Sequence, residues 1–211
     1  MTEDLRLRPP RIDAALILRL HKYRRPERVA PRLRAVAAQM AALAETLLEP
    51  RGWLRRLGVR SVEPQGRVVL DDGVAFHSRA LAHRLAGASE AVLLVLTIGA
   101  ALERRAQALV REEHLVEGLL LDTAGWVALN ALLRDVRQLL AADARRRGYR
   151  LTARMAPGFA GWPLEEQRAL FRALFAAFPE GALTVRLTKR CVMRPSKSVS
   201  GLWGLVPAGT P

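Results

Sequence analysis

Residues 91–99 read AVLLVLTIG, and this apolar stretch decides the fold class. Ala91–Leu96 carries no polar side chain and is too short for an ordinary globular helix, so it predicts a strand at the centre of a sheet. The apolar run continues to Leu102 only with interruptions at Thr97 and Gly99, well short of the roughly 18 residues that a membrane span needs. We therefore expect a sheet protein without a membrane partner.

Helix-period patterns surround this strand. The longest covers residues 115–147, where Gly148 ends the pattern. Its expected buried face comprises Leu115, Leu119, Trp126, Leu133, Val136 and Leu140. Further helices are expected from near Asp13, over residues 27–49 and 100–112, from Ser78 to Gly87, and from Pro163 with Leu170, Leu174 and Phe178 on one face.

Two more strand signals complete the pattern. Arg67–Leu70 and Val74–His77 flank Asp71-Asp72-Gly73, which predicts a hairpin. Apolar and polar residues alternate over Leu183–Leu187, and we expect this strand to share a twisted, largely antiparallel sheet with Ala91–Leu96. Because no regular βαβ repeat appears, the fold class is α+β, with the sheet flanked by long helices.

The 211 residues are enough for one domain, which we place at residues 11–211 after a loose N-terminal arm at residues 1–10. The net charge of +14 is a reason to consider nucleic acid. However, 31 of the 34 basic residues are arginines spread over most helices, and the tight cluster Arg145–Arg147 has no interleaved aromatic residues. We expect no specific nucleic-acid binding.

Signatures of common enzyme classes are missing from the sequence. It has no glycine-rich phosphate loop, GxSxG, HExxH or paired-cysteine spacing, and its four histidines are scattered. The single cysteine, Cys191, cannot form an internal disulfide and is expected to be a small buried side chain. We assign no catalytic side chain and no metal ligand, and expect a cytoplasmic protein.

Two C-terminal segments carry binding chemistry. The first reads RMAPGF over residues 154–159, followed by GWPLEEQ over 161–167. Its Pro-Gly pair predicts a tight turn whose backbone can approach a ligand, and Arg154 offers a fork of donors for a carboxylate. The alternative is that Phe159 and Trp162 only fill the core beneath a loop. The second segment, residues 187–201, reads LTKRCVMRPSKSVSG.

These segments resemble the C-terminal activation domain of cobalamin-dependent methionine synthase, in particular its small stand-alone relatives. That family carries an R-x-x-P-G-[YF] turn, a W-P-L-E-x-Q-like helix start, and an L-T-x-S-x-x-M-x-P-x-x-S-V-S-G segment. Weaker similarity upstream involves Ile12-Asp13, Ser78–Leu85, Thr97–Gly99 and Leu121–Gly125. The resemblance therefore covers most of the chain.

The resemblance implies a domain that binds S-adenosylmethionine and presents its methyl group to a cobalamin held by a methionine synthase partner. A flavodoxin-type donor would supply one electron. By the same resemblance, the cofactor-binding residues are Arg154, Ala156, Gly158, Phe159 and Trp203. Cobalamin is expected only through the partner, because this chain lacks the D-x-H-x-x-G pattern that supplies a lower cobalt ligand.

Three positions depart from the family pattern. Asn130 stands where relatives often carry an acidic residue, and Lys189-Arg190 replaces an acidic residue followed by serine. Added positive charge is unfavourable for a sulfonium ligand. These departures motivate an alternative, a non-catalytic binding or assembly module in corrinoid metabolism that has lost cofactor binding.

Overall fold

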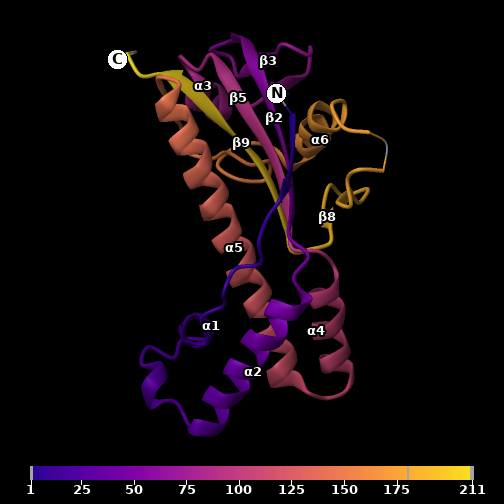
Figure 1. The fold of residues 1–211 in the computed structure, drawn as a ribbon. Helices are drawn as coiled ribbons and strands as arrows, with labels where there is room; N and C mark the ends of the chain where they lie inside the picture. Colours follow the sequence, from indigo (N-terminus) through magenta and orange to yellow (C-terminus); the bar gives the residue numbers. More distant parts are fainter. Residues whose placement is uncertain (1, 180, 210–211) are drawn as a thin grey trace.

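The computed structural model describes residues 2–179 and 181–209, which form a seven-stranded sheet with helices around it (Figure 1). The main sheet has the order β4-β3-β2-β5-β9-β6, and β1 also pairs with β2. Its strands are β1 (Thr2–Arg6), β2 (Arg51–Val62), β3 (Arg67–Leu70), β4 (Ala75–His77), β5 (Glu90–Thr97), β6 (Tyr149–Leu151) and β9 (Ser198–Pro207). A separate pair joins β7 (Arg186–Leu187) to β8 (Met193–Arg194). All described strand pairs are antiparallel, which confirms the α+β prediction.

The helices follow the predicted order. They are α1 (Ala14–Leu20), α2 (Pro31–Leu47), α3 (Arg79–Leu85), α4 (Ala101–Arg111), α5 (Leu115–Arg146) and α6 (Gln167–Phe175), with short 3-10 turns η1 (Pro26–Arg28) and η2 (Leu164–Glu166). Asp13 and Ser78 cap α1 and α3, each accepting a hydrogen bond from a backbone N–H of the first turn. Two predicted helices are shorter than expected, since α2 starts at Pro31 and α6 at Gln167.

The predicted central strand is confirmed. β5 lies between β2 and β9, and every side chain of Ala91–Leu96 is fully buried. Its residues alternate between two clusters: Val92, Leu94 and Leu96 face one, and Leu93 and Val95 face the other. The sheet is therefore buried on both faces at this strand.

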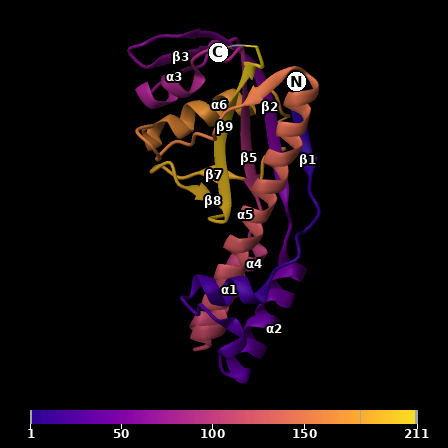
Figure 2. The same cartoon turned by 90° about the vertical axis from the view of Figure 1, so that its left-hand side faces the viewer.

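The two faces of the sheet have different covers. We call the side packed against α5 the helix face; its hydrophobic cluster continues along α5 to α1, α2 and α4. We call the side packed against α3, α6 and the segments 152–166, 176–179 and 181–197 the loop face. Figure 2 shows α3, α6 and the β7–β8 pair together on one side of the sheet. In both views α1, α2 and α4 gather around one end of α5, beyond the end of the sheet.

The prediction that Leu183–Leu187 joins the central sheet is wrong. Only Arg186 and Leu187 form a strand, and they pair with β8 in the separate two-stranded sheet. Leu183 and Val185 are buried on the loop face without strand pairing. An extended segment packed against a sheet face shows the same alternation as a strand, so the pattern alone did not separate the two.

Part of the predicted buried face of α5 is also wrong. Val136 and Leu140 are buried, but Leu115, Leu119 and Trp126 each expose more than half of their surface. Small residues and leucines elsewhere on the helix are buried instead: Leu121, Ala124, Ala128 and Leu132. The first half of α5 is apolar nearly all round, so periodicity did not determine which stripe packs.

The N-terminal residues form an edge of the sheet. Within the predicted loose arm, residues 2–6 form β1 and pair with β2, so this part is attached to the sheet.

Helix α5 is the one helix in the described ranges that is long and apolar enough to cross a membrane by length and composition. Half of that apolar stretch is buried inside the protein.

Candidate functional site

The segment predicted to bind a ligand is a compact turn. The Phe159 N–H donates to the Ala156 carbonyl (3.1 Å), and the Gly158 N–H donates to the Trp162 carbonyl (2.7 Å). Gly158 has a φ of 88°, in the left-handed region that glycine adopts without strain. In the described residues, the Ala156 N–H and the Gly158 carbonyl make no hydrogen bond.

The turn is held against the end of the loop face by several contacts. Met155 and Leu202 exchange two backbone hydrogen bonds of 2.9 Å, which tie the turn to β9. The Ser78 hydroxyl donates to the Gly161 carbonyl (3.0 Å). The Trp162 ring is fully buried and meets Phe76 edge to face at 5.3 Å. The turn therefore has a rigid base.

Gly201 of β9 allows this close approach. A Cβ atom at this position would lie 2.5 Å from the Met155 carbonyl oxygen and 2.9 Å from Nη1 of Arg154. The Arg154 guanidinium could move aside, but the backbone carbonyl is too close for any side chain, so a larger residue would push the turn away from the strand. The glycine of the predicted S-V-S-G segment thus has a packing role.

Arg154 is the charged group of the turn. Its Nη1 donates to the Ser200 carbonyl at 2.6 Å, and burial lowers the pKa of its guanidinium below the ordinary value. Among the described residues no carboxylate forms an ion pair with it. A partly buried guanidinium with a neutral acceptor retains donors for an anionic group.

Gln167 and Ser200 form a buried polar pair beside the turn. The Ser200 hydroxyl donates to Oε1 of Gln167 (3.0 Å), which joins the start of α6 to β9. Sequence reasoning assigned neither residue a role, although both belong to the quoted motifs. Their burial, 2% and 4% exposed, identifies them as part of the frame that positions the turn.

The structure brings four of the five predicted ligand residues together. Arg154, Ala156, Gly158 and Phe159 share the turn, where the Phe159 ring is 70% exposed and open to a ligand. Trp203 is fully buried among the side chains of the helix face. It has no surface through which to touch a ligand at the turn, so this placement favours a packing role.

The three departures from the family pattern are all at the surface. The Asn130 amide donates to the Trp126 carbonyl of its own helix (2.9 Å). Lys189 and Arg190 are exposed, and the Lys189 carbonyl accepts a hydrogen bond from Arg168. No described contact joins these residues to the turn.

The described part of the chain holds no group of three or more histidine, cysteine or acidic side chains placed to bind a metal ion. His21 shares a hydrogen bond with Thr123 (2.8 Å), and His77 lies 3.5 Å from Glu166. Cys191 is buried, as predicted.

Comparisons with known proteins give one informative result. No family model matches the chain, and no curated protein matches it by sequence. Among solved structures, it is similar to the crystal structure of the MetH reactivation domain bound to AdoHcy, with a TM-score of 0.72 and 16% identity. The match covers 100% of this chain and 80% of the other. The chain therefore has the fold of the MetH reactivation domain.

Proposed function

We propose that this protein binds S-adenosylmethionine and acts as a reactivation component for a cobalamin-dependent methionine synthase held in a separate chain. The fold supports the proposal, since the similar structure is described as bound to AdoHcy, the demethylated form of the same cofactor. The observation that carries it for this chain is Arg154, a partly buried cation at an open turn with no carboxylate partner among the described residues.

The residues of the turn fit the parts of this ligand. Arg154 would pair with the ligand carboxylate through its free donors, while the Ala156 N–H and the Gly158 carbonyl would bond to polar groups. The exposed Phe159 ring would pack beside the adenosyl portion. Each of these roles positions the ligand, and no side-chain nucleophile is needed for them.

The partner would supply the chemistry that this chain lacks. A cobalamin held by the partner would supply the methyl-accepting metal chemistry, and a flavodoxin-type donor would supply the single electron that reductive methylation of cob(II)alamin requires. The sulfonium of S-adenosylmethionine would leave as the neutral thioether, S-adenosylhomocysteine. This chain would bind and orient the methyl donor.

Isothermal calorimetry with S-adenosylmethionine tests the proposal. Arg154→Ala should weaken binding by at least about tenfold, because a charge-assisted hydrogen-bond pair contributes roughly 1.5–3 kcal/mol. Arg154→Lys should not restore affinity, since a point charge lacks the planar fork. Arg150→Ala, at an exposed residue of the neighbouring β6, is the matched control and should bind like wild type.

Three outcomes would each contradict one part of the proposal. If Arg154→Ala binds normally with an unchanged circular-dichroism spectrum, Arg154 is only a clamp on the Ser200 carbonyl. If the wild type shows no binding at millimolar ligand, the alternative of an assembly module without cofactor binding is supported. A purified chain carrying tightly held cobalamin in its visible spectrum would contradict the separate-partner arrangement.

A further inference from the structure

A dense basic cluster follows α1. Residues 22–34 read KYRRPERVAPRLR and contain six cations and one acid. The cations are Lys22, Arg24, Arg25, Arg28, Arg32 and Arg34, and all are exposed. Sequence reasoning considered only the arginine run at 145–147, although this cluster is also contiguous in the sequence. The structure adds that Lys22, Arg24, Arg25 and Arg28 line one hollow of the surface.

The charges of this cluster are not neutralised within the described residues. None of the six cations forms an ion pair there. Arginines elsewhere do form such pairs: Arg55 with Asp72, and Arg147 with Glu90. Uncompensated charge on one surface attracts a partner of opposite sign.

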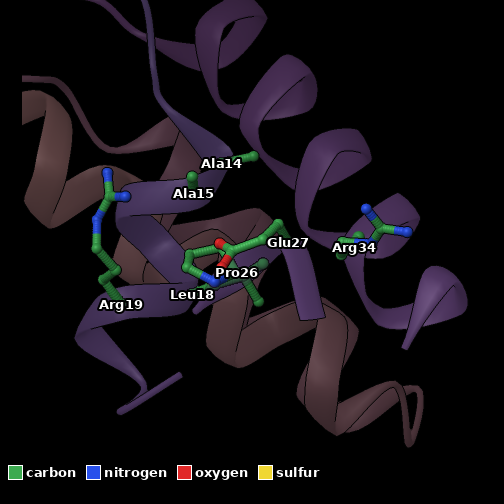
Figure 3. Close-up of a pocket in the computed structure, with 7 residues that line it drawn as sticks. All are labelled: Ala14, Ala15, Leu18, Arg19, Pro26, Glu27 and Arg34. Atoms are coloured by element: carbon green, nitrogen blue, oxygen red, sulfur yellow. The ribbon is translucent and has the colours of Figure 1, made fainter. Parts of the chain in front are cut away.

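Two open hollows lie beside the cluster, each lined by both apolar and charged side chains. One, of about 530 Å³, is lined by Tyr23, Val29 and Leu33 together with four of the cations. The other, of about 340 Å³, lies between α1 and α2 (Figure 3). In Figure 3, Pro26 and Glu27 lie between the side chains of Arg19 and Arg34, which extend away on opposite sides. We call the surface formed by residues 22–34 the α1–α2 basic surface.

The backbone that carries the cluster is fixed in place. Lys22 adopts a left-handed φ of 72°, and the Tyr23 N–H donates to the Leu18 carbonyl (3.1 Å) as α1 ends. His21 bonds to Thr123 on α5 (2.8 Å), which ties the loop to the longest helix. The surface is therefore preorganised, which lowers the entropy lost on binding.

We propose that the α1–α2 basic surface docks an acidic protein segment that inserts an apolar side chain among Tyr23, Val29 and Leu33. Arginine and tyrosine are enriched in protein interfaces while lysine is depleted, and five of the six cations here are arginines. Single-stranded nucleic acid needs several stacking platforms, and this surface offers one exposed ring, Tyr23. A membrane surface favours protruding apolar side chains, whereas Val29 and Leu33 are half-buried.

This surface is separate from the proposed cofactor site. The turn at Arg154 lies beside β9, whereas α1 and α2 lie beyond the end of the sheet (Figures 1 and 2). The inference does not rest on the proposed function. A variant that loses docking should keep its affinity for S-adenosylmethionine. The two measurements therefore show separately whether the docking proposal or the proposed function fails.

Fluorescence anisotropy on the full chain tests the docking. The probe is a short labelled peptide of glutamates with a central pair of leucines. The triple variant Arg24→Ser, Arg25→Ser, Arg28→Ser should weaken its binding at least about tenfold. The matched control, Arg104→Ser, Arg134→Ser, Arg137→Ser, removes the same charge from exposed sites on α4 and α5 and should change binding by less than about twofold.

A second measurement tests the apolar part of the site. Tyr23→Ser should weaken binding of the leucine peptide. It should not weaken binding of a matched peptide that has serines in place of the leucines. Equal losses for the two triple variants would overturn the proposal, because binding would then follow net charge alone. Tighter binding of a single-stranded oligonucleotide, or of phosphatidylserine vesicles, than of the leucine peptide would also overturn it.

Discussion

The helix face and the loop face of the sheet are packed with different kinds of side chain. On the helix face the buried cluster is aliphatic, with Trp203 as its single buried aromatic residue within the described chain. On the loop face the cluster contains Trp53, Phe76, Trp162 and Phe171, and the buried pair Gln167–Ser200 lies beside it. The two faces share one sheet but differ in the kind of interaction that holds them.

This difference separates stability from binding. Regular helices satisfy their own backbone groups, so the helix face needs only apolar packing. The loop face positions a turn with left-handed residues, and such backbone persists only where surrounding contacts fix it. We therefore expect substitutions on the two faces to have similar effects on folding but different effects on the ligand.

The sharpest comparison uses one fully buried tryptophan from each face. Trp203→Ala and Trp162→Ala should each lower the free energy of unfolding by roughly 3–5 kcal/mol, because each leaves a large cavity. Urea denaturation measures this loss. The milder variants Trp203→Leu and Trp162→Leu leave smaller cavities. Calorimetry on these two variants measures their affinity for S-adenosylmethionine.

Only the loop-face variant should change ligand affinity. Trp162 supports the turn through its contact with Phe76, whereas Trp203 packs against the helices. Weaker binding by Trp203→Leu would show that this residue contacts the ligand after all, as the family resemblance implied. Unchanged binding by Trp162→Leu would remove the distinction between the faces.

A smaller effect is expected at the buried polar pair. Ser200→Ala leaves Oε1 of Gln167 without its described partner, so stability should fall by about 1–3 kcal/mol. The double variant Ser200→Ala, Gln167→Leu removes both polar groups and should recover part of that loss. If the double variant is less stable than the single one, the hydrogen bond is not what makes the pair important.

The smallest expected effect on stability is at the ion pair that joins α5 to β2. Arg56 donates to Asp143 (2.8 Å), and this hydrogen bond holds the pKa of the Asp143 carboxyl below its ordinary value of 3.8. A carboxyl with a lowered folded pKa stabilises the fold above its unfolded pKa, and that contribution is lost as the pH falls through the folded value. Asp143→Asn should thus destabilise the protein at pH 7.

The side chain of Asp143 is partly exposed, so the loss at pH 7 should be under about 1 kcal/mol. Thermal unfolding of wild type and variant across acidic pH measures it. The two curves should converge once the carboxyl is protonated. A difference that persists in acid would mean that the asparagine disturbs packing.

The central strand was predictable because nothing polar interrupts it, but both of its partners were missed. In β2, Arg55 and Arg56 are largely buried through ion pairs with Asp72 and Asp143, so charges broke the apolar pattern of a real strand. In β9, Gly201 and Gly204 interrupt the apolar pattern. A Cβ at Gly201 would lie 2.5 Å from the Met155 carbonyl oxygen, so the close approach of the turn requires a residue that disfavours strands.

The candidate site was predictable to a similar degree. The turn at residues 154–159 followed from its arginine and its Pro-Gly pair, which act locally. The role of Gln167 depends on Ser200, 33 residues away, and becomes visible only when α6 packs against β9. Local motifs therefore predicted the residues proposed to contact the ligand, whereas the frame that positions them required the fold.

The place of β9 in the sheet has a consequence for biosynthesis. Thr97 and Ser198, whose hydroxyls bond across β5 and β9, are separated by 101 residues. A nascent chain on the ribosome therefore carries β5 with one edge unpaired until β9 emerges. An apolar strand with an open edge is prone to intermolecular pairing. We expect yield during translation to depend on chaperones that shield β5.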